Sequence, residues 1–128
     1  MFIRFRISEK DLGSGKPKGL FAAIDDLEQA GELSSYELDH LKSLDRWFNK
    51  NLPVPTALSK SGKPHATPIA LSWFKDSASG YISKMRDIAG ILEEHGISVT
   101  MLYTQKPGYI VYEDDFQVAA QPFPDTPI

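Results

Sequence analysis

The sequence predicts an α+β fold: a two-layer sandwich in which about three helices cover one face of an antiparallel sheet of about four strands, in the order β-α-α-α-β-β-β. Apolar and polar residues alternate near both ends of the chain, which is typical of strands. Apolar residues at helical spacing occupy three segments between them. A C-terminal three-stranded meander cannot bury its apolar face alone, so we expect the N-terminal strand to join it and the helices to pack over one side.

The length of 128 residues favours a single domain over residues 1–128, because two halves of about 64 residues each would be near the lower limit for independent cores. The chain has no cysteine, which excludes disulfides, thiolate zinc sites and thiol nucleophiles. No segment approaches the ~18 consecutive apolar residues of a membrane span, and the N-terminus does not resemble a targeting signal. These observations predict a cytoplasmic protein that does not contact membranes.

The first strand is predicted over residues 2–7, where the two faces differ in character. One face carries Ile3, Phe5 and Ile7, and the other carries Phe2, Arg4 and Arg6. A loop over residues 8–18 follows, and then a helix up to Ala30 that Gly31 ends. Its apolar stripe consists of Leu20, Phe21, Ile24 and Leu27, while Asp25, Asp26 and Glu28 are expected on its solvated face.

The second helix has the clearest start signal in the chain. Ser34 and Glu37 match a capping box, in which each side chain accepts a hydrogen bond from the other residue's backbone amide. Pro53 ends the helix, since the residue before a proline resists helical geometry. The buried stripe is predicted to include Leu38, Leu41, Leu44 and Phe48, with Trp47 at its border and packed against the first helix. The short link between the two helices predicts an antiparallel hairpin.

Residues 53–68 hold several prolines and are expected to form an irregular connection. The short apolar segment 69–74 is expected to be a helix or turn that leads into a third helix over residues 79–94. Within that segment, Trp73 and Phe74 are adjacent large aromatics. They are expected either to close one end of a small core or to form an exposed anchor for a partner.

The last third of the chain alternates like a β-meander. Strands are expected over residues 97–104, 109–113 and 116–120. Pro107-Gly108 suits the centre of a type II turn between the first two strands, and Asp114-Asp115 suits the turn before the third. Prolines break the pattern after this point, so the tail over residues 122–128 is expected to be extended or frayed.

Sequence motifs for common cofactors and metals are missing. The segment 13–17 has Pro17 where a phosphate-binding loop needs its magnesium-binding hydroxyl. The three histidines are His40, His65 and His95, and none has the spacing of a metal site. The acidic run 113–115 fits a turn better than a cation site. We therefore predict no cofactor, no bound metal and no catalytic residues.

Four motifs resemble those of a set of small uncharacterised bacterial proteins that share this layout over nearly their whole length. The motifs are residues 1–5 (MFIRF), 47–53 (WFNKNLP), 72–76 (SWFKD) and 109–118 (YIVYEDDFQV). The resemblance implies a single compact domain and carries no activity, catalytic residue or cofactor.

The leading functional prediction is a non-enzymatic protein-binding or regulatory module whose partner is another protein or a second copy of the chain. The candidate partner-binding residues are Arg4, Arg6, Trp73, Phe74 and Tyr112. One alternative is a small enzyme that uses dispersed carboxylates with His65 or His95. Another is weak nucleic-acid binding through the face of Arg4 and Arg6 beside Tyr112, although the net charge of -3 disfavours this.

Overall fold

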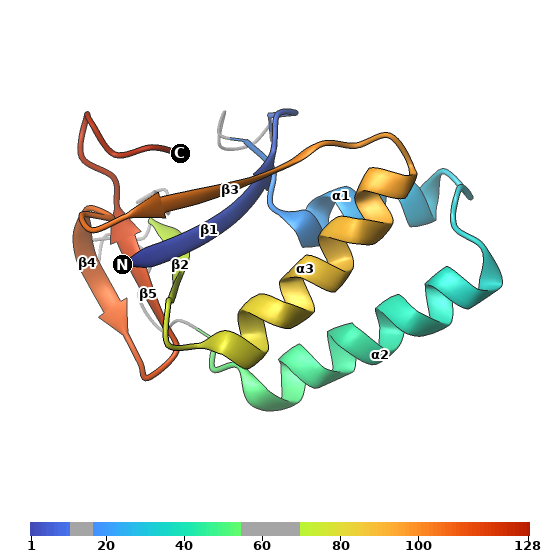
Figure 1. The fold of residues 1–128 in the computed structure, drawn as a ribbon, viewed down its shortest axis with the longest axis horizontal. Helices are drawn as coiled ribbons and strands as arrows, with labels where there is room; N and C mark the ends of the chain where they lie inside the picture. The colour runs from blue at the N-terminus through green and yellow to red at the C-terminus, as the bar shows by residue number, and fades with distance from the viewer. Residues whose placement is uncertain (11–16, 55–69) are drawn as a thin grey trace, which may run out of the picture. The chain divides into compact units, whose positions relative to one another are not determined.

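The computed structural model describes residues 1–10, 17–54 and 70–128. This part of the chain is α+β (Figure 1). The helices are α1 (Leu20–Gln29), α2 (Ser35–Asn51) and α3 (Ser79–Glu94). The strands are β1 (Phe2–Ile7), β2 (Leu71–Lys75), β3 (Val99–Thr104), β4 (Tyr109–Glu113) and β5 (Gln117–Gln121). Some of the expectations concern residues that the structure does not describe. They are the loop residues 13–16, most of the connection 53–68, and His65 within that connection.

Among the described residues, the antiparallel sheet has five strands in the order β3-β1-β2-β5-β4, where about four were expected. The additional strand is β2, in the segment expected to be a helix or turn. It pairs with β5 through Trp73↔Val118 and with β1 through Ile3↔Phe74. The β2 sequence, LSWFK, sets two aromatics side by side and so lacks the strict apolar–polar alternation that identifies a half-exposed strand.

The predicted three-stranded meander is wrong. Of the three strands expected in the meander, β4 and β5 are neighbours and form a hairpin, whereas β3 lies at the other edge of the sheet beside β1. Pro107-Gly108 therefore does not join a pair of adjacent strands. A turn signal is local, and it does not specify which strand the chain joins after the turn.

Contacts within the chain group it into two compact units. The sheet unit comprises Met1–Arg4, Pro53–Ser79 and Met101–Ile128, and the helical unit comprises Phe5–Leu52 and Gly80–Thr100. Strands β1 and β3 each contribute residues to both units. The expected single domain with helices over one sheet face stays a prediction.

The sheet unit is built around β2 and β5. Trp73 and Val118 pair across these strands and are both fully buried. At the start of β4, Gly108 has a φ of 129° and its backbone passes close to that of Gln121. The end of the chain, expected to fray, forms a turn in which Thr126 Oγ1 donates to the Lys106 carbonyl oxygen at 3.2 Å.

The helical unit confirms the predicted helix signals. Ser34 and Glu37 form the capping box at the start of α2, and Gly31 after α1 has a φ of 70°. The rings of Phe21 and Phe48 meet edge to face with their centres 5.3 Å apart. This contact joins the start of α1 to the end of α2, so the two helices are antiparallel as expected.

The predicted register of α2 is confirmed for Phe48, which is 5% exposed. The expected packing of Trp47 against the first helix is wrong. Its ring lies 4.9 Å from that of Tyr81 on α3, and the Lys84 Nζ lies 5.0 Å from its centre. Helices α2 and α3 run side by side in Figure 1, and Trp47 lies on the side of α2 that faces α3.

Candidate functional site

A shallow groove lies between α1 and α2 in the helical unit. Each helix lines it with residues at i, i+3, i+4 and i+7, which share one helix face. The α1 face contributes Phe21, Ile24, Asp25 and Glu28, and the α2 face contributes Leu38, Leu41, Lys42 and Asp45. Leu33 from the connecting turn and Ile88 from α3 complete the lining. We call this set of residues the hairpin groove.

The floor of the hairpin groove is apolar. Ile88 is 1% exposed, and Ile24 and Leu41 are also buried. Phe21 stands at its edge and is 38% exposed although it is a large aromatic. The groove is partly open and has a volume of about 180 Å³. This is near the ~150 Å³ of a cavity that holds one benzene molecule, and below the ~300–1,000 Å³ of sites for larger ligands. The space suits one side chain.

The rim of the hairpin groove is charged, and all four rim side chains are exposed: Asp25, Glu28, Lys42 and Asp45. Three carboxylates and one ammonium give a net charge of two negative. Asp45 accepts a hydrogen bond from Asn49 Nδ2 at 3.4 Å. Within the described part of the chain, neither Asp25 nor Glu28 has an ion-pair partner. Both carboxylates are exposed at the rim.

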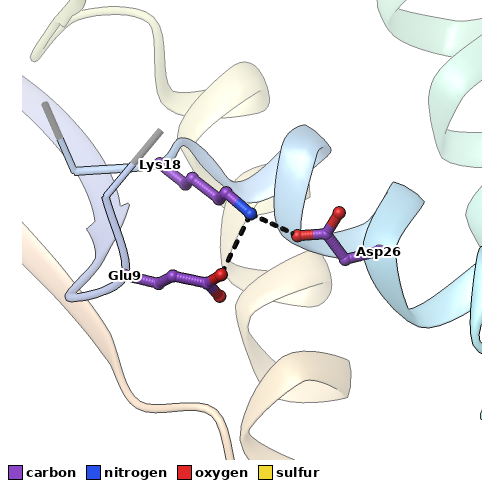
Figure 2. A network of polar contacts seen from close by, with 3 residues as sticks. All are labelled: Glu9, Lys18 and Asp26. Carbon is purple, nitrogen blue, oxygen red and sulfur yellow. Dashed lines mark hydrogen bonds and ion pairs between the residues drawn. The ribbon is translucent and has the colours of Figure 1, made fainter. Parts of the chain in front are cut away.

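Lys18 fixes the start of α1. Its Nζ lies 2.6 Å from Asp26 Oδ2 on α1 and 3.2 Å from Glu9 Oε1 after β1, as Figure 2 shows. Hydrogen bonds to Asp26 and Glu9 raise the pKa of the Lys18 ammonium above its ordinary value of 10.5. Asp26 is therefore paired with Lys18. Its neighbour Asp25 lines the hairpin groove.

Glu37 and His95 fix the start of α2 against the end of α3. Glu37 Oε1 accepts from the Ser34 amide at 2.9 Å, and Glu37 Oε2 lies 2.8 Å from His95 Nε2. The Ser34 amide and the His95 ring hold the pKa of the Glu37 carboxyl below its ordinary value of 4.5. Glu37 Oε1 thus caps its own helix and Oε2 links α2 to the residue after α3. Neither Glu37 nor His95 lines the hairpin groove. This arrangement stabilises the fold.

The residues predicted to bind a partner do not form one site. Trp73 is 1% exposed, so it belongs to the core instead of an exposed anchor. Arg4 and Arg6 alternate with buried residues of β1 as expected, and both are half-buried. Arg6 Nη1 donates weakly to the Ile7 carbonyl oxygen at 3.5 Å.

Tyr112 lies on the other face of the sheet from Arg4, so the predicted shared face is wrong. Paired residues point to the same face. Phe2 pairs with Lys75, which places Arg4 with Lys75 and Trp73. Tyr112 and Ser72 both pair with Ala119, which places Tyr112 on the face of Phe74. The pairing shifts between Ile110 and Tyr112, and such an irregularity reverses the alternation on which the prediction depended.

Asp114 and Asp115 lie in the turn between β4 and β5, as the sequence indicates, and Glu113 is the last residue of β4. Asp114 Oδ1 accepts from the backbone amides of Phe116 and Gln117, and Asp114 Oδ2 accepts from the Tyr112 hydroxyl at 2.8 Å. Burial raises the pKa of the Asp114 carboxyl, but these hydrogen bonds outweigh it and hold the pKa below its ordinary value of 3.8. In the described residues, no group of three or more carboxylate or imidazole side chains could hold a metal ion.

Comparison of the chain with family models, with curated proteins and with solved structures finds no match. Among the described residues, no helix is both long enough and apolar enough to cross a lipid bilayer. Since the comparisons supply no function, a functional proposal has to rest on the structure, and the hairpin groove is the feature that carries it.

The hairpin groove was not predicted from the sequence. Asp25 and Glu28 were expected on a solvated face opposite the apolar stripe, whereas they border that stripe beside Phe21. The available signal was the spacing of Phe21, Asp25 and Glu28 by four and three residues, which puts an aromatic and two acids on one face of a helix.

Proposed function

We propose that the chain is a non-enzymatic protein-binding module and that the hairpin groove is its docking site. The observation that carries this is Phe21, an aromatic that is 38% exposed at the edge of an apolar floor. Aromatic residues, phenylalanine among them, are enriched in protein interfaces relative to the rest of a protein surface. The charged rim of the groove resembles the polar rim of a protein interface.

The lining of the hairpin groove supports binding over catalysis. It offers aliphatic side chains, one aromatic ring, carboxylates and one lysine, with no histidine or hydroxyl among its described residues. Nucleophilic or acid–base chemistry needs a base within hydrogen-bond reach of the reacting group and a third group that orients it. The pair that comes nearest, His95 and Glu37, lies outside the groove and joins two helices.

The test compares capture of host proteins by three immobilised forms of the chain. The Phe21→Ser variant removes the exposed ring of the groove. The Tyr36→Ser variant is the matched control, because Tyr36 is an aromatic of the same unit that is 80% exposed and does not line the groove. We expect a protein held by the wild type and by Tyr36→Ser whose affinity falls about tenfold or more with Phe21→Ser.

Circular dichroism and urea denaturation establish that both variants fold. A partner that binds Phe21→Ser as tightly as the wild type would contradict docking at the hairpin groove. A second copy of the chain as the captured partner would support self-association through the same site.

A further inference from the structure

We propose that the hairpin groove takes a basic segment of another protein, with one large apolar side chain on the floor and an arginine or lysine against the α1 rim. This inference rests on the proposed function and assigns the chemistry of the partner. It follows from the charges of the rim, their spacing along α1 and the volume of the groove.

The α1 rim concentrates negative charge. Asp25 and Glu28 are three residues apart, which corresponds to about 4.5 Å along a helix axis and places them on one face. Both are exposed and, in the described part of the chain, neither has an ion-pair partner. A guanidinium carries five N–H donors in a planar fork, so a single arginine can reach both carboxylates.

The α2 rim differs from the α1 rim. Lys42 and Asp45 are also three residues apart, so opposite charges stand side by side there. A cation approaching the groove is attracted to Asp25 and Glu28 on one side and meets one positive and one negative side chain on the other. The charge pattern therefore sets the orientation of the bound segment, with its basic residue over α1.

The volume of the groove sets the apolar part of the segment. About 180 Å³ above the buried side chains of Ile24, Leu41 and Ile88 suits one phenyl ring or one leucine side chain. A segment with one such residue next to basic residues places the ring on the floor and the cation at the rim. The inferred partner chemistry is therefore a large apolar residue flanked by arginine or lysine.

The experiment titrates the isotope-labelled full chain with three tripeptides at low salt and follows its amide resonances by NMR. The probes are acetyl-Arg-Phe-Arg-amide, acetyl-Gln-Phe-Gln-amide and acetyl-Glu-Phe-Glu-amide, which share the phenyl ring and differ in charge. We expect shifts at Phe21, Ile24 and Leu41. We also expect the arginine tripeptide to bind about threefold to tenfold more tightly than the glutamine tripeptide, and the glutamate tripeptide to bind most weakly.

Two double variants locate the source of this preference. The change Asp25→Asn with Glu28→Gln removes the two α1 rim charges. The control, Glu32→Gln with Asp39→Asn, removes two exposed carboxylates of the same unit that do not line the groove. The net charge of the two variants is equal. We expect the preference for the arginine tripeptide to be lost in the first variant and kept in the second.

Three other outcomes of these titrations would contradict either the basic partner or the docking site. Equal binding of all three tripeptides in the groove overturns the basic partner and leaves the docking site supported. If the variant Asp25→Asn with Glu28→Gln still prefers the arginine tripeptide, the basic partner is also overturned, because the attraction then comes from charges outside the α1 rim. Absence of shifts at the groove residues with every tripeptide overturns the docking site and with it the proposed function.

Discussion

Gly108 allows two backbone segments of the sheet unit to pass closer than any side chain would permit. A Cβ at this position would overlap the Gln121 carbonyl oxygen and lie 2.6 Å from the carbonyl carbon and 2.8 Å from Pro122 Cα. Its φ of 129° is also one that residues with side chains rarely adopt. We expect Gly108→Ala to lower the free energy of unfolding by about 2 kcal/mol or more, measured by urea denaturation.

Gly90→Ala is the matched control for Gly108→Ala. Gly90 lies inside α3, and an added Cβ would meet no atom within 4 Å. Alanine favours a helix over glycine, so this change should stabilise the protein by about 0.5–1 kcal/mol. Equal effects of the two substitutions would contradict the close approach at Gly108.

Ser34 caps α2 through a hydrogen bond from the Glu37 amide to its Oγ at 3.2 Å. We expect Ser34→Ala to lower the free energy of unfolding by about 0.5–2 kcal/mol, because the amide loses its acceptor. Ser35→Ala, one residue further along the helix, should have little effect. Chemical denaturation of the two variants measures the difference, and a silent Ser34→Ala would show that the cap does not stabilise the helix.

Glu37 should make stability depend on pH in the acid range. The pKa of its carboxyl in the folded protein lies below the ordinary 4.5. Its contribution to the free energy of unfolding is therefore present above about pH 4.5 and is lost as the pH falls through the folded pKa. Urea midpoints of the wild type and Glu37→Gln should therefore differ most near neutral pH and converge in acid. If the difference between the two urea midpoints instead grew as the pH fell, the predicted direction of the pH dependence would be wrong.

Helix α2 presents two neighbouring aromatics to different surroundings. Phe48 is buried against Phe21, whereas Trp47 is half-buried beside Tyr81. We expect Phe48→Ala to cost about 3–5 kcal/mol, as for a buried aromatic, and Trp47→Ala to cost less. Denaturation of both variants gives the ranking. A larger loss for Trp47→Ala would mean that the indole is more enclosed than its exposure indicates.

At the scale of elements, the signals that predicted correctly were local ones. The capping box of Ser34 and Glu37 and the glycine after α1 act within a few residues, and the structure has both helix ends where these signals place them. Strand pairing is non-local. Nothing within residues 71–75 indicates that β1 and β5 lie on either side of β2, so the strand was mistaken for a helix or turn.

The candidate site depends on two elements together, which explains why the sequence did not predict it. The stripe of Phe21 and Ile24 and the stripe of Leu38 and Leu41 each have the spacing of an ordinary buried helix face. Only the antiparallel packing of α1 on α2 leaves space between them and places acidic residues at the edge. The arginines and aromatics predicted instead were selected by residue type, and the register of the sheet separates them.

At the scale of the whole molecule, the chain builds two compact units from interleaved segments, and the groove lies within one of them. The helical unit holds its helices by contacts at both ends of α2. Phe48 contacts Phe21 of α1 at one end, and Glu37 contacts His95 after α3 at the other. The hairpin groove is therefore lined by helices that other contacts hold in place, which reduces the ordering cost of binding a partner.

Intermolecular nuclear Overhauser effects would show whether the hairpin groove receives a large apolar side chain beside a cation. The measurement uses acetyl-Arg-Phe-Arg-amide and the full chain with labelled methyl groups. We expect contacts from the phenyl ring to the methyls of Ile24, Leu41 and Ile88. Contacts confined to methyls outside the groove, such as those of the exposed Ile110 on β4, would contradict this expectation.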